Sequence, residues 1–196
     1  MKRVEISAGA ILLLSAIYFF GGMRSLAALL FAVIVHELGH IAAIALYGGR
    51  VHGLKVSISG LCIICSGAGG TMESVICLCA GPAAGFALAY AASYFGNLSQ
   101  NLLLIKTAGF SLVLSVYNSL PALPLDGGRA LESIARCFGG TVFAQTLLEF
   151  TGMLTGAALL FAGAFFIRRQ FGAALLIAGV WVLTAQTGIV KSGSML

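Results

Sequence analysis

The stretch "VIVHELGHIAAIAL", residues 33–46, places two histidines and one glutamate inside an apolar run. On an α-helix His36 and His40 share a face, and Glu37 lies about 100° from His36 and about 60° from His40. An ionisable group near the centre of a bilayer costs at least about 2.5 to 3.5 kcal/mol, so the cluster needs a compensating partner. The three side chains therefore predict a functional site within a helix.

The spacing H-E-x-x-H on a helix is the zincin signature, in which both imidazoles bind zinc and the glutamate acts as general base toward a water. The alternative is a pair of hydrogen-bonded histidines in the core of a helix bundle. That alternative leaves Glu37 unexplained, whereas a metal ion compensates the whole cluster. We therefore expect a Zn²⁺ site that includes His36 and His40, with Glu37 as the catalytic acid and base.

The composition is that of a membrane protein. Of the 196 residues, 60% are hydrophobic and 9% are charged, whereas soluble domains are about a quarter charged. A bilayer core takes roughly 20 apolar residues per helix. We expect an all-α polytopic membrane protein, a single domain over residues 1–196 with no PDZ or CBS domain. Its six expected transmembrane helices are Ile6–Phe20, Leu26–Tyr47, Met72–Phe95, Leu102–Leu123, Val142–Ile167 and Phe171–Val190.

The charges indicate topology. The formal net charge is +5, but the basic residues are scattered between the apolar segments, which excludes a nucleic-acid patch. With both termini in the cytoplasm, seven basic residues lie inside and four lie outside, as the positive-inside rule favours. The first apolar segment resembles a signal peptide, but a second follows at once, so we expect an uncleaved helix in the cell membrane.

A short β-hairpin is expected between the second and third transmembrane helices. Residues 51–65 begin with apolar and polar residues in alternation, and Gly60 interrupts them before a second apolar run. Alternation with period two is typical of a strand, and glycine favours a turn. Backbone of this kind is tolerated at membrane depth only where protein or a wet cavity surrounds it. We therefore expect a membrane-associated hairpin that offers a sheet edge.

Two cysteine pairs suggest a metal or redox site at first sight, Cys62 with Cys65 and Cys77 with Cys79. On a strand, residues three apart point to opposite faces, and on a helix residues two apart are separated by roughly 200°. Neither pair converges on one ion without a special turn. We interpret these cysteines as small apolar residues.

Two pairs of glycines, Gly81 with Gly85 and Gly152 with Gly156, have the small-x-x-x-small spacing that lets helices approach closely. We expect them to pack helices within one bundle. The alternative use is dimerisation.

The fourth apolar segment runs into "NSLPALPLDGG", residues 118–128. Pro121 and Pro124 break the helical pairing there, and the two glycines at the end permit a turn. A short helix over about Gly128–Phe138 is expected to follow at the cytoplasmic surface.

A catalytic zinc ion normally takes three protein ligands and keeps one position for water. Asp126 is the best third ligand, because it is the only aspartate in the chain and follows a helix that two prolines break. The topology places it at the cytoplasmic end of one helix, at a depth compatible with His36 and His40 on another. Four further residues are less suitable: His52, Glu73, Glu132 and Glu149.

Asn118 lies eight residues before Asp126 and would be costly if its amide were unpaired in lipid. Two roles remain open from the sequence: the amide bonds a neighbouring helix, or it orients a substrate backbone.

At these residues the chain resembles the site-2 protease group of intramembrane metalloproteases (peptidase family M50), whose pattern is H-E-x-x-H in one helix and N-x-x-P-x-x-P-L-D-G-G in another. Here the two motifs read "HELGH" and "NSLPALPLDGG". The resemblance implies that His36, His40 and Asp126 bind zinc and that Glu37 is the catalytic acid and base. It also implies that Asn118, Pro121 and Pro124 help to bind substrate.

Within that group the chain most resembles the stage IV sporulation protein FB branch, which lacks a PDZ domain and releases a pro-sigma factor from the membrane. Many relatives of that branch carry a C-terminal CBS domain, and many place an asparagine where this chain has Gly85. The resemblance implies a membrane-associated protein substrate, such as a pro-sigma factor, and leaves room for membrane-bound regulators.

The sequence therefore predicts a zinc-dependent intramembrane endopeptidase. Its expected role is regulated intramembrane proteolysis during sporulation. A polytopic metal-binding transporter is the rival class, but it predicts several clusters of ionisable residues along a route, and the sequence has one. An inactive scaffold is a second rival, but it would be expected to have lost Glu37 or a ligand.

Overall fold

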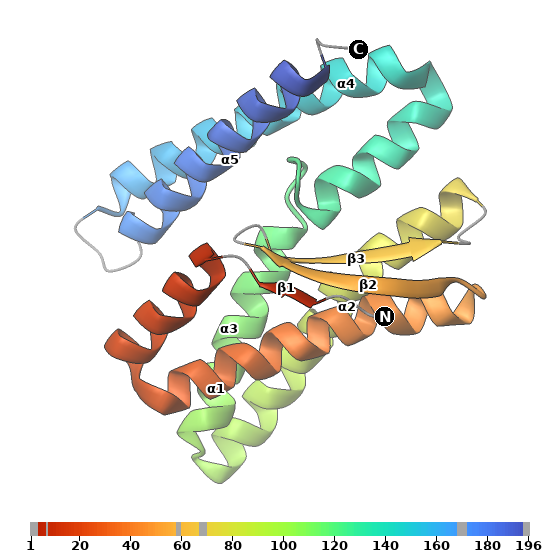
Figure 1. The fold of residues 1–196 in the computed structure, drawn as a ribbon. Coiled ribbons are helices and arrows are strands. Elements are labelled where there is room, and N and C mark those ends of the chain that lie inside the picture. Colours follow the sequence, from red (N-terminus) through yellow and green to blue (C-terminus); the bar gives the residue numbers. More distant parts are fainter. Residues whose placement is uncertain (1–3, 7, 58–59, 67–69, 168–171, 194–196) are drawn as a thin grey trace. The chain divides into compact units, whose positions relative to one another are not determined.

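The computed structural model of the chain describes residues 4–6, 8–57, 60–66, 70–167 and 172–193 (Figure 1). Helices and strands form two compact units, one ending at Asn118 and the other beginning at Ser119. Among the described residues, the first unit contains three helices and three strands, and the second contains two helices.

Helix α1 (Ala8–Leu46) carries the H-E-x-x-H motif in its second half. Gly22 interrupts the helix with φ 70° and ψ 177°, a backbone conformation that glycine adopts without a steric penalty. The break lies between the first two expected transmembrane helices. The chain begins differently from the expectation, because Val4–Ile6 is a strand, β1, and the helix starts at Ala8.

The strands form a three-stranded sheet in the order β1-β2-β3. β2 (Arg50–Ser57) and β3 (Gly60–Ser66) are antiparallel and lie where the sequence predicted a hairpin. Gly60, where the turn was expected, instead begins β3 and pairs with Ser57; residues 58–59, between the two strands, lie outside the described residues. β1 pairs with β2 in parallel, and nothing in the alternation of residues 51–65 predicted this third strand. α1 packs against β2 and β3.

Helices α2 (Thr71–Ser99) and α3 (Leu102–Asn118) pack antiparallel against each other, and both pack against α1. Glycines bring the backbones together, as the small-x-x-x-small spacing predicted for Gly85. A Cβ on Gly96 would meet Ile105 at 3.1 Å, near the loop. At the other end, the hydroxyl of Ser111 donates to the carbonyl of Gly85 at 2.8 Å. α3 ends at Asn118, five residues before the expected Leu123, because the proline segment follows.

In the second unit, α4 (Asp126–Phe165) packs against α5 (Gly172–Gly193). Gly140 interrupts α4 with φ 75° and ψ −171°, so the expected surface helix and the expected fifth apolar segment are the two halves of one kinked helix. Residues 119–125 form the irregular segment before α4, in which the Leu123–Pro124 peptide bond is cis.

In the described part of the chain, three helices are long and apolar enough to cross a membrane: Gly21–Leu46, Thr71–Ser99 and Asp126–Phe165. Leu102–Asn118 and Gly172–Gln186 are shorter apolar helices. The expected number of six transmembrane helices therefore stays a prediction.

Candidate functional site

The two histidines of the H-E-x-x-H motif lie together on one face of α1. His36 is 3% exposed and His40 is 7% exposed. Their rings meet edge to face with centroids 5.0 Å apart, and the two Nε2 atoms are 3.3 Å apart. The helix thus turns one nitrogen of each imidazole toward the same point, as the four-residue spacing predicted.

The main chain of α2 fixes the tautomer of His40. Nδ1 of His40 lies 2.7 Å from the carbonyl oxygen of Cys77. A carbonyl accepts hydrogen bonds only, so Nδ1 carries the proton and donates it. Nε2 of the neutral ring is then left with a lone pair, the form of imidazole that binds metals. A backbone carbonyl that orients a histidine in this way is a common outer partner of metal sites.

The spacing of the two nitrogens fits a metal ion. With zinc–nitrogen distances of about 2.0–2.1 Å and tetrahedral angles, two imidazole nitrogens on one zinc ion are about 3.4 Å apart. The Nε2 atoms of His36 and His40 are 3.3 Å apart. The distance fits a zinc ion shared by the two rings, and it also fits a hydrogen bond between them.

Gly81 of α2 makes room for the ring of His40. A Cβ at this position would collide with Nε2 of His40, and it would lie 2.5 Å from Cε1 and 2.6 Å from Cδ2. Gly39 of α1, the residue before His40, faces α2 closely too, since a Cβ there would lie 2.6 Å from the carbonyl oxygen of Ala80. The imidazole therefore rests on bare helix backbone.

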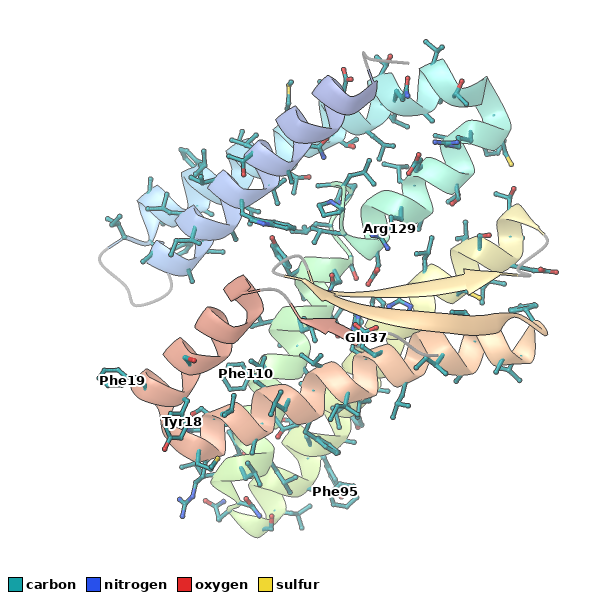
Figure 2. The ribbon with its side chains drawn as sticks, in the orientation of Figure 1. Tyr18, Phe19, Glu37, Phe95, Phe110 and Arg129 are labelled. Atoms are coloured by element: carbon teal, nitrogen blue, oxygen red, sulfur yellow. The ribbon has the colours of Figure 1, made fainter. Side chains whose placement is uncertain are left out.

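Glu37 follows His36 on α1 and is half-buried. Figure 2 labels it on the side of α1 where the strands are drawn, and α1 contacts β2 and β3. The catalytic role predicted for Glu37 stays a prediction.

Asn118 is the last residue of α3 and is half-buried. Its Nδ2 donates to the carbonyl of Leu114 at 3.2 Å, one turn back on its own helix. This bond is neither of the two roles predicted from the sequence, and the substrate-orienting role stays a prediction.

Asp126 opens α4 in the second unit and is half-buried. The segment before it contains Pro121, which is exposed, and Pro124, which is half-buried. The start of α4 packs closely against this segment: the backbones of Gly127 and Ser119 are so near that a Cβ on Gly127 would collide with Ser119. The glycine predicted to allow a turn here in fact allows a close backbone contact.

The other four acidic or histidine candidates are less suited to the site. Glu132 pairs with Arg136 one turn along α4, at 2.5 Å. Glu149 is exposed on α4, and Glu73 lies in the first turn of α2. His52 lies in β2, and its side chain lies outside the described ones.

The cysteines do not converge where the structure describes them. Cys77 is buried and Cys79 is exposed, so the two thiols lie on different sides of α2. Cys62 and Cys65 both lie in β3, whose backbone alone is described.

The fold resembles that of site-2 proteases. The solved structure of the Site-2 Protease from Methanocaldococcus jannaschii matches with a TM-score of 0.71, over 94% of this chain and 89% of that chain, at 20% sequence identity. No protein-family model and no curated protein matches the sequence. The likeness shows the fold, and the chemistry has to be argued from the side chains described above.

Sequence reasoning missed two groups beside the histidines. The carbonyl of Cys77 has no signal in a sequence, because every residue carries one. Gly81 did have a signal, since it belongs to a small-x-x-x-small pair, but that pattern predicted helix packing and not contact with a histidine ring.

Proposed function

We propose that the chain is a zinc-dependent intramembrane endopeptidase that cleaves a membrane-associated protein. The observation that carries the proposal is the pair of buried imidazoles on α1, with Nε2 atoms 3.3 Å apart and with the Nδ1 proton of His40 held by the carbonyl of Cys77. Hydrogen-bonded core histidines would not need Glu37 beside them. The likeness of the fold to a site-2 protease supports the same function.

We propose Asp126 as the third ligand beside His36 and His40. Two contacts within the units support it. α2 and α3 are antiparallel, and Gly85 lies against Ser111 and Ser115, so Asn118 ends α3 near the level of Gly81 and the ring of His40. Ser119 is bonded to Asn118 and lies against Gly127, the residue after Asp126.

Zinc, when bound, would polarise the scissile carbonyl and lower the pKa of a water toward about 7. His36, His40 and Asp126 would hold it. Glu37 would take a proton from the attacking water and return it to the leaving amine, which is general acid–base catalysis. The buried histidines and the apolar helix around them would exclude bulk water from the charges that develop.

A substrate must be extended for its peptide bond to be cut, because a helix buries that bond in its own hydrogen bonding. β3 has one neighbour, β2, among the described strands, and its other edge suits an added strand of substrate. We propose that Asn118 and the backbone around Pro121 and Pro124 also contact the substrate.

The proposed membrane location rests on composition and topology, and the proposed substrate rests on the sequence resemblance. We propose a multi-pass protein of the cell membrane with about six transmembrane helices and cytoplasmic termini, acting on a membrane-associated protein. A pro-sigma factor is the first candidate, and it rests on the sequence resemblance alone. A role in sporulation and membrane-bound regulators rest on the same resemblance.

Metal removal tests this function directly. We expect protein purified in detergent to contain about one zinc ion per chain, to lose cleavage of a co-expressed membrane-tethered substrate on chelation, and to regain it when zinc is added. Zinc per chain is measured by elemental analysis and cleavage by gel. A wild type that binds no zinc would contradict the proposal and favour an inactive scaffold, whereas zinc transport into vesicles would favour a transporter.

Replacement of Gly81 by alanine should weaken zinc binding by at least about tenfold, the lower end of the effect of outer residues on metal affinity. The reason is steric, since the new methyl group would displace the ring of His40. Zinc affinity is measured by competition with a chelator.

Gly109→Ala is the matched control. It is the same chemical change on α3, where a Cβ would meet nothing within 4 Å. It should leave zinc affinity unchanged and, as alanine favours helices over glycine by about 1 kcal/mol, should not lower stability. Equal zinc affinity in the two variants would show that the bare backbone at Gly81 is not needed.

A further inference from the structure

Gln186 of α5 is a buried amide inside an apolar helix. Its side chain is only 4% exposed, and its Nε2 donates to the carbonyl oxygen of Leu123 at 3.3 Å. A buried amide is costly unless it is hydrogen-bonded. The bond gives the buried amide of Gln186 an acceptor on half-buried Leu123, 63 residues earlier in the chain.

A notch in α4 lets Gln186 reach this carbonyl. Gly152 is buried, and a Cβ there would collide with Nε2 of Gln186 and lie 2.5 Å from its Cδ. One turn further along α4, Gly156 faces an apolar side chain instead, with a Cβ position 2.6 Å from Cδ2 of Leu183. The first glycine of the pair thus serves a polar contact, and the second serves ordinary helix packing.

Leu123 is linked rigidly to Asp126. Pro124 fixes one backbone angle between them, and Leu125 is 2% exposed. The amide of Leu125 donates to the carbonyl of Ala122 at 3.0 Å, and Ala122 is itself fully buried. Only two residues, Pro124 and Leu125, therefore separate the Leu123 carbonyl from Asp126, and the backbone of both is restricted.

We propose that Gln186 is a positioning residue for the metal site: through the notch at Gly152 it holds the Leu123 carbonyl and thereby aims Asp126. This inference rests on the proposed function, because it takes Asp126 as a metal ligand. Two main-chain carbonyls would then help to position metal ligands, one that accepts from His40 and one that accepts from Gln186.

The test uses full-length protein in detergent and zinc as the probe. Gln186→Leu keeps the size of the side chain but removes the donor, and Gly152→Ala keeps the amide but pushes it out of the notch. Both should weaken zinc affinity by roughly 10- to 100-fold, the range for outer partners of metal ligands. In metal-free protein, the amides of Ala122 and Leu125 should exchange hydrogen roughly two- to tenfold faster, as loss of one hydrogen bond implies.

Gly156→Ala is the control for helix packing, because it crowds Leu183 at the same α4–α5 contact and should leave zinc affinity unchanged. A double variant supplies a second control. If Gly152→Ala acts through Gln186, then adding it to Gln186→Ala should weaken zinc binding no further.

The outcomes separate this inference from the proposed function. Wild-type protein that binds no zinc overturns the proposed function, and the positioning role falls with it. Wild-type protein that binds zinc, with the same affinity in Gln186→Leu, overturns the positioning role alone. Equal losses in Gly152→Ala and Gly156→Ala also overturn it, since general helix packing would then explain both. Losses in Gln186→Leu and Gly152→Ala alone, with faster exchange at Ala122 and Leu125, establish it.

Discussion

Glu37→Gln should retain wild-type zinc content and lose cleavage by about 10²- to 10⁴-fold, the usual contribution of a general acid or base. Glutamine has almost the same shape as glutamate, so the half-buried site on α1 is not disturbed. Its amide cannot take a proton from water at neutral pH. Zinc per chain and the initial rate of cleavage in detergent, measured on the same preparation, check the two halves of this expectation.

Two results would contradict this role of Glu37. Normal cleavage by Glu37→Gln would remove it from the catalytic step and favour the scaffold or transporter. Loss of zinc together with cleavage would make Glu37 a structural partner of the histidines. Glu149→Gln is the matched control, because Glu149 is an exposed glutamate on α4, and its substitution should change neither zinc content nor rate.

Asp126→Ala should lose both zinc and cleavage. If Asp126 is the third ligand, its removal leaves two imidazoles, and zinc affinity should fall by more than the roughly 10- to 100-fold that outer partners contribute. Zinc competition with a chelator measures the affinity, and cleavage of the membrane-tethered substrate measures the activity. The free energy of unfolding of the metal-free protein should fall by only about 0.3–1 kcal/mol, the contribution of an acidic side chain in the first turn of a helix.

Glu132→Ala is the control for Asp126→Ala. It distinguishes the loss of a metal ligand from the loss of a negative charge elsewhere on α4. Glu132 lies on the same helix and pairs with Arg136, and such a pair contributes only about 0.3–0.5 kcal/mol. Its loss should leave zinc bound. If Asp126→Ala retains zinc as tightly as Glu132→Ala does, Asp126 is not a ligand, and the third ligand must be sought elsewhere in the chain.

The sequence predicted what local spacing controls. The four-residue interval of His36 and His40 determined that the imidazoles share a face, whatever surrounds them. The two prolines before Asp126 predicted the irregular segment at residues 119–125, whereas the glycines after it lie within α4. The breaks in the long helices also fell near expected boundaries, at Gly22 and Gly140.

Groups brought together by tertiary packing were not predictable in this way. The carbonyl of Cys77 meets His40 across 37 residues, and Gln186 meets Leu123 across 63. Gln186 did carry a signal, since an amide within an apolar segment is costly without a partner, but the sequence does not name the partner. β1 was missed because a three-residue strand has too few residues to show a period.

The contact of His40 with bare backbone at Gly81 has a mechanical consequence. The imidazole of His40 projects from α1. It also contacts α2, which touches the ring at Gly81 and accepts a hydrogen bond from Nδ1 through the carbonyl of Cys77. No flexible arm separates the imidazole of His40 from either helix. The two helices therefore cannot slide or spread at this contact without moving the ring of His40.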